Sequence, residues 1–156
     1  MRRDYFTLAV HGIDWVDSGE SPEQPTVRID FEGPATLLHE RLTGLTAAPL
    51  EASDIDVSFR FVTPIDDDVP RGVFAITDRI TGDYVLEVNT DIARIDDFVR
   101  AAKAFGEATD DEDRYRIVID IEGDKIVVYE KRTFLLYNQQ GNLLREESLI
   151  PSGVEL

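Results

Sequence analysis

Cysteine is absent from the 156 residues of this chain, and histidine occurs only twice. The absence of cysteine excludes disulfides, thiol nucleophiles and thiolate metal sites. A histidine metal site needs further ligands at fixed spacings, as in His-Glu-x-x-His. His39 and Glu40 match the start of that motif, but Thr43 stands where the second histidine belongs. We therefore expect structural roles for His11 and His39, with no metal and no cofactor.

Lysine is also scarce. Only Lys103, Lys125 and Lys131 are lysines among the 16 basic residues, and 32 acidic residues bring the formal net charge to −16. The apolar fraction of 42% is far above that of a disordered chain. An acidic surface keeps a folded protein hydrated in strong salt, where the Debye length falls to about 3 Å and self-repulsion costs little. These features favour a halophilic cytoplasm, and an ordinary acidic protein in ordinary salt is the alternative.

The same charge argues against nucleic acid as a direct partner, because that affinity comes largely from neutralising phosphates and falls steeply with salt. No run of 18 apolar residues occurs, so no membrane-spanning helix is expected. The start, MRRDYF, has the twin arginine of an export signal. However, His11, Asp14 and Asp17 interrupt the apolar stretch that such a signal needs next. We expect a cytoplasmic protein that contacts neither nucleic acid nor membrane directly.

No nucleotide-binding or hydrolase motif occurs. The chain has no G-x-S-x-G, no P-loop and no G-x-G-x-x-G. The acidic stretches 66–68 and 110–113 lack the ligand spacing of an EF-hand. Carboxylate pairs suited to acid–base catalysis are too numerous among 32 acids to single one out. The sequence therefore nominates no catalytic residue, and we expect the protein not to be an enzyme.

Hydrophobic periodicity predicts the secondary structure. Apolar residues alternate with polar ones in 55–62, and they recur every three to four positions in 90–108. The full prediction comprises strands 3–10, 26–32 and 55–62, hairpins 73–89, 115–132 and 134–150, helices 34–43 and 90–108, and a surface loop at 12–25. Three hairpins make a sheet mainly antiparallel. We predict one domain, 1–156, of the α+β class: a mainly antiparallel sheet of about eight strands with two helices packed on one face.

Turn residues define the ends of these elements. The hairpins have turn signals at 81–83, 122–124 and 140–142, each containing one glycine. Gly44 suits the left-handed stop of the helix predicted at 34–43.

The segment 125–147 is unusual because it is locally basic. Between residues 125 and 145 four basic residues stand against Glu130 alone, whereas the preceding residues 107–124 are strongly acidic. One interpretation is that adjacent antiparallel strands pair these opposite charges, which is worth about 0.2–1 kcal/mol per pair. The other is a face that docks an acidic partner or a second copy of the chain. The candidate interaction surface comprises Tyr129, Lys131, Arg132, Tyr137 and Arg145.

Both ends of the chain resemble a known family. The stretches MRRDYFTLAVHGIDWVD and RYRIVIDIEGDKIVVYEKRTFLLYNQQGNLLREESLIPSGVEL, with TGDYVLEVN and FVRAAKAFGE between them, are similar to a small uncharacterised family of haloarchaeal proteins, a domain of unknown function. The resemblance covers nearly the whole chain. It implies a single-domain protein of salt-loving archaea, and it brings no activity, substrate or catalytic residue.

Three functional hypotheses remain open. The leading one is a non-enzymatic cytoplasmic domain that acts through protein–protein contact, either with another protein or as a homodimer. The second is a small-ligand-binding protein or enzyme with a carboxylate-lined pocket, into which His11 and His39 would converge. The third is an accessory of a nucleic-acid machine that is reached through a protein partner.

Overall fold

The computed structural model describes residues 5–43, 48–63, 71–109 and 113–150, without the side chains of 92–94. The elements, in chain order, are β1 (Phe6–His11), α1 (Trp15–Ser18), β2 (Thr26–Phe31), α2 (Ala35–Arg41), the 3-10 helix η2 (Ala52–Asp54), β3 (Ile55–Phe61), β4 (Arg71–Asp78), β5 (Tyr84–Asp91), α3 (Ile92–Ala108), β6 (Tyr115–Ile121), β7 (Asp124–Lys131) and β8 (Leu135–Tyr137). Eight strands and an α+β class are confirmed.

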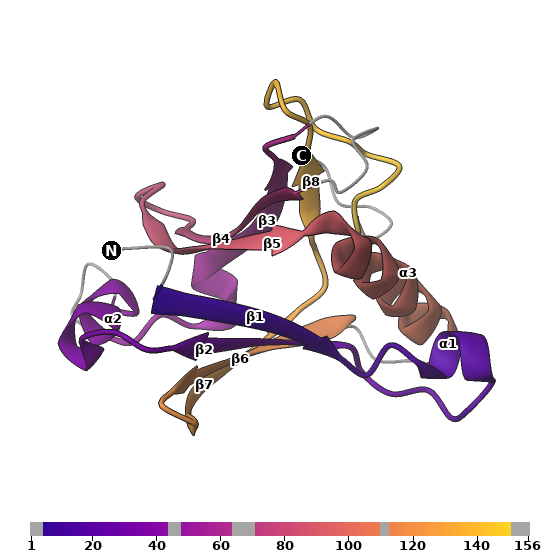
Figure 1. Ribbon diagram of the computed structural model, residues 1–156, viewed down its shortest axis with the longest axis horizontal. Coiled ribbons are helices and arrows are strands. Elements are labelled where there is room, and N and C mark those ends of the chain that lie inside the picture. The colour runs from indigo at the N-terminus through magenta and orange to yellow at the C-terminus, as the bar shows by residue number, and fades with distance from the viewer. Residues whose placement is uncertain (1–4, 44–47, 64–70, 110–112, 151–156) are drawn as a thin grey trace.

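The eight strands form two sheets rather than one. The first sheet has the order β1-β2-β6-β7 and the second has the order β5-β4-β3-β8. Each contains one parallel pair, β2 with β6 and β3 with β8, among antiparallel ones. Figure 1 shows the first sheet below the second, with α3 beside them at one end and α2 at the other. The helices therefore do not share one face of a single sheet.

The hydrophobic core lies between the two sheets. One cluster takes Ile29 from β2, Ile117 from β6, Phe59 from β3 and Phe74 from β4. Phe98 of α3 joins this cluster and is fully buried. The alternating residues of β3 explain its place, because its apolar residues are buried and its polar ones are not. The opposite face of the first sheet carries Arg28, Arg116 and Glu130 beside Val118 and Val128, and no described helix covers its lower side in Figure 1.

The hairpin between β6 and β7 turns where its residues predicted. Ile121 pairs with Asp124, so Glu122 and Gly123 form a two-residue loop. Both have positive φ, 50° and 86°, as a type I′ turn requires. The turn predicted at 81–83 is also present, with Gly82 at φ 77°.

Two local predictions differ from the structure. The loop predicted at 12–25 contains α1, where the buried Trp15 donates from Nε1 to the carbonyl oxygen of Gly12 at 2.6 Å. A helix of four residues is too short for its apolar residues, Trp15 and Val16, to show a helical period, which is why it was not predicted. The third hairpin is incomplete: β8 pairs in parallel with β3, and the returning segment makes only isolated bridges, such as Phe134 with Leu149.

The helix predicted at 34–43 is α2, with Pro34 as its N-cap and Leu42 as its C-cap. The predicted stop, Gly44, lies outside the described residues.

Candidate functional site

The structure separates the five residues of the predicted interaction surface. β7 carries Tyr129 and Lys131 in the first sheet, whereas β8 carries Tyr137 in the second. Arg132 follows β7, and Arg145 lies exposed in the segment after β8. Figure 1 shows that segment at the top of the molecule, away from β7. The basic stretch of sequence therefore does not form one continuous surface.

Tyr129 is not available to a partner. It is 2% exposed and belongs to the hydrophobic core. Its hydroxyl donates a hydrogen bond to the carbonyl oxygen of Leu50 at 3.1 Å. Burial, and then the negative charge of Asp54, raise the pKa of Tyr129 to about 12. Its aromatic ring stabilises the fold, so its inclusion in the predicted surface was wrong.

Lys131 is also buried, with only 9% exposed. Its Nζ donates to the carbonyl oxygens of Ala52 and Ile55 at 2.7 and 2.8 Å. Burial is the main cause that lowers the pKa of this ammonium, and the positive charge of Arg79 lowers it further; Asp56 and Asp113 act in the opposite direction, and Arg132 adds the smallest lowering effect. An ammonium has three hydrogens, so one is not used by these two carbonyl groups.

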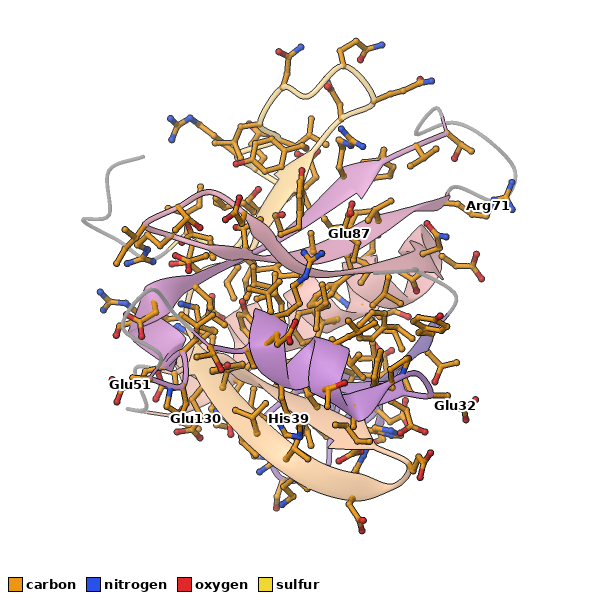
Figure 2. The ribbon with its side chains drawn as sticks, turned by 90° about the vertical axis from the view of Figure 1, so that its left-hand side faces the viewer. Glu32, His39, Glu51, Arg71, Glu87 and Glu130 are labelled. Atoms are coloured by element: carbon orange, nitrogen blue, oxygen red, sulfur yellow. The ribbon has the colours of Figure 1, made fainter. Side chains whose placement is uncertain are left out.

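Lys131 lines a hollow of about 440 Å³ beside η2, which we call the η2 hollow. The lining residues are Ala52, Ser53, Asp56, Val57, Arg79, Asp113, Glu130, Lys131, Arg132, Thr133 and Leu135. Figure 2 shows Glu51 and Glu130 near one edge of the molecule; Glu51 is the N-cap of η2, and Glu130 lies on β7. Three cationic side chains therefore meet there, from the turn after β4 and from the end of β7.

Two of the carboxylates that line the η2 hollow, those of Asp56 and Glu130, have different partners. Asp56 accepts hydrogen bonds from Nε and Nη2 of Arg79 on one oxygen, at 3.1 and 2.9 Å. Alternation along β7 directs Glu130 to the face opposite Lys131, where its pairing partner on β6 is Arg116. Arg132 is exposed and forms no ion pair with the described residues.

Sequence reasoning missed Arg79 and Asp56, because residues about 50 or more positions from Lys131 become its neighbours only through packing. It anticipated one charge pair between β6 and β7. Arg116 is the register partner of Glu130, and Asp120 is the register partner of Lys125. The pair of Asp120 with Lys125 is the kind that the first interpretation expected, whereas the pair of Arg116 with Glu130 has the signs reversed and Lys131 is opposite Tyr115.

A second, acid-lined hollow of about 500 Å³ lies between α2 and the turn joining β4 to β5. We call it the acid-lined hollow, because Glu40, Asp78, Asp83 and Glu87 contribute carboxylates to its wall, with Arg41 as the basic residue. His11 and His39 are exposed and line neither hollow.

The described residues contain no group of three or more histidines and carboxylates that could hold a metal ion. Within the same residues, no helix has the length and apolar character to cross a membrane.

Comparison with known proteins adds one decisive finding. A family model described as a family of unknown function, DUF5793, matches residues 1–156. The chain belongs to this family. The resemblance to a domain of unknown function is thereby confirmed. Neither the curated proteins nor the solved structures contain a match to the chain, so the membership names no substrate, partner or activity.

Proposed function

We propose that this member of DUF5793 is a non-enzymatic interaction domain, and that its η2 hollow receives an acidic segment of a partner protein. The observation that carries the proposal is the convergence of Arg79, Lys131 and Arg132 on one hollow in a chain of net charge −16. A carboxylate entering the hollow would meet the exposed guanidinium of Arg132 and the unused hydrogen of Lys131. Charge-assisted hydrogen bonds of this kind are stronger than neutral ones.

The three cations of the hollow, which is also lined by the carboxylates of Asp56, Asp113 and Glu130, support this direction of binding. Two guanidinium groups contribute to the lowered pKa of Lys131, so a bound carboxylate would relieve repulsion among three cations. The Arg79–Asp56 pair holds one of those cations in place. The rest of the protein surface attracts an acidic segment only weakly, because that surface is itself strongly acidic. Such a partner would therefore be recognised at this hollow, with its charge pattern setting specificity.

Charge reversal at Arg132 tests the proposal without disturbing the core. Tagged wild-type protein, Arg132→Glu and the control Lys125→Glu would be incubated with lysate of the source organism, cross-linked, and analysed by mass spectrometry. Lys125 is exposed on the same strand and does not line the η2 hollow. We expect one partner, cross-linked near the hollow, to be retained by wild type and by Lys125→Glu and lost by Arg132→Glu. Retention by Arg132→Glu would contradict the proposed surface, and mass measurement in solution would identify a second copy as the partner.

A small-ligand role at the acid-lined hollow is the second candidate. Its support is the group of four carboxylates around one arginine, which suits a cationic ligand. Asp78 is nearly buried, and its Oδ1 accepts from the backbone N–H groups of Ile80 and Thr81, so this carboxylate has a structural role. Metabolites bound to protein purified from the source organism, compared with Glu87→Gln, would identify such a ligand; an unchanged set would contradict this candidate.

We also propose that the domain works in the cytoplasm of a halophilic archaeon. Its support is the excess of 32 acidic over 16 basic residues in a chain that still builds a hydrophobic core. Screening by multimolar KCl weakens the repulsion among these charges. The free energy of unfolding should therefore rise steeply between 0.1 and about 2 M KCl. A flat dependence would favour ordinary salt.

A further inference from the structure

Two buried carboxylate oxygens have no hydrogen-bond partner within the described residues, and they belong to neighbouring side chains. They are Oδ1 of Asp30 and Oδ1 of Asp120. Asp30 on β2 and Asp120 on β6 are register partners in a parallel pair. Their side chains therefore leave the same face of the first sheet, from strands about 4.8 Å apart. A buried carboxylate oxygen without a donor is costly, and two side by side point to a missing cationic ligand.

One cation is already present beside this pair. Nε of Arg28 donates to Oδ2 of Asp120 at 2.6 Å, and the side chain of Asp120 is only 4% exposed. Arg28 leaves one negative charge uncompensated among the three groups. Lys125 is the register partner of Asp120 on β7, but it is exposed and leaves Oδ1 of both aspartates without a hydrogen bond. The remaining charge is thus suited to a single monovalent cation.

The two aspartates border a hollow of about 390 Å³ on the uncovered face of the first sheet, which we call the sheet hollow. Its other lining residues are Thr7, Leu8, Ala9, Arg28 and Gly123. Thr7 is the register partner of Asp30 on β1, so a hydroxyl oxygen follows the two carboxylates in one row across the sheet. This row offers only oxygen atoms, which are the ligands that hard cations prefer.

We propose that Asp30 and Asp120 bind one monovalent alkali-metal cation, with the hydroxyl of Thr7 and water completing its coordination. A divalent ion fits less well for two reasons. It would leave an excess positive charge next to Arg28, and small divalent ions such as Mg²⁺ give up their water reluctantly. A bound cation would join β1, β2 and β6 at the centre of the sheet, and its loss would destabilise the fold.

Crystals of the full chain grown with RbCl, and in parallel with choline chloride, provide the direct test. An anomalous-difference peak that contacts Oδ1 of both aspartates in the rubidium crystals alone is the expected result. The proposal is overturned if rubidium occupies other positions but not this one. It is equally overturned if the two oxygens contact each other, or an ordered water, in both crystals.

Stability in solution gives an independent test. Urea midpoints would be compared in KCl, NaCl and choline chloride at equal ionic strength, because a ligand that binds only the folded state raises the midpoint. We expect wild type to have a higher midpoint in at least one of the alkali salts than in choline chloride. Asp30→Asn should lose that difference, since its amide can donate directly to Oδ1 of Asp120. Asp124→Asn, an exposed control on the same sheet, should keep it.

The urea midpoint of an acidic protein responds to cations in general. The Asp124→Asn control separates this general response from binding at the proposed site. Equal loss of the cation effect in Asp30→Asn and Asp124→Asn would overturn the proposal. A wild-type midpoint that does not distinguish choline from the alkali cations would also overturn it.

Discussion

Replacing Tyr129 by phenylalanine removes one hydroxyl group from the core beside η2. That hydroxyl donates to the carbonyl oxygen of Leu50, and burial is the main reason that the pKa of Tyr129 rises from 10.0 to about 12. At pH 7 the variant leaves a buried carbonyl group without this donor. Loss of a partner in a buried site costs about 1–3 kcal/mol, so we expect Tyr129→Phe to reduce the free energy of unfolding by that amount.

The alkaline behaviour follows from the raised pKa. The unfolded chain releases the phenolic proton near pH 10, and the folded protein retains it until about pH 12. The stabilising contribution is therefore complete below pH 10 and is lost as the pH rises through 12. At 1.36 kcal/mol per pH unit this interval corresponds to about 2.7 kcal/mol. Wild type should lose about this much more stability than Tyr129→Phe, so that the difference between them vanishes at high pH.

Urea unfolding followed by far-UV circular dichroism, repeated from pH 7 to above pH 12, measures this difference. Tyr84→Phe is the matched control, because Tyr84 is half-exposed on β5 and does not belong to the hydrophobic core. If Tyr129→Phe follows wild type in parallel over the whole pH range, burial does not control the proton of Tyr129, and the reasoning is refuted.

Three further substitutions test the packing. Phe98→Ala empties a fully buried aromatic position and should cost about 3–5 kcal/mol in the free energy of unfolding; a loss below 1 kcal/mol would contradict its central place. Gly72→Ala places a methyl group against the ring of Phe59 and a backbone carbonyl group, so urea unfolding should report a loss of about 1–3 kcal/mol. Lys131→Met removes an ammonium bonded to two carbonyl groups and should cost about 1–3 kcal/mol at pH 7. Because the pKa of Lys131 is lowered, wild-type stability should increase as the pH rises from that pKa toward 10.5, and Lys131→Met should lack this increase.

Local patterns predicted the secondary structure well, because they depend on residues close together in the chain. The alternation in 55–62 became β3, and the glycine of 122–124 became the turn between β6 and β7. The predicted interaction surface was less successful, since charge alone was used to infer exposure. Lys131 shows the difficulty: a long side chain can be buried when backbone carbonyl groups accept its hydrogens.

Composition and short-range pattern in the chain establish its acidity, the lack of thiol chemistry, the α+β class and the position of most strands. They do not establish which strands become neighbours. The parallel pairing of β2 with β6 joins residues about 90 positions apart, and no local pattern specifies such a contact. Folding brings Asp30 beside Asp120 and Arg79 beside Lys131, so both proposed sites arise from packing. Secondary structure depends on near neighbours, whereas the chemistry of these sites depends on side chains that meet only when the two sheets have formed.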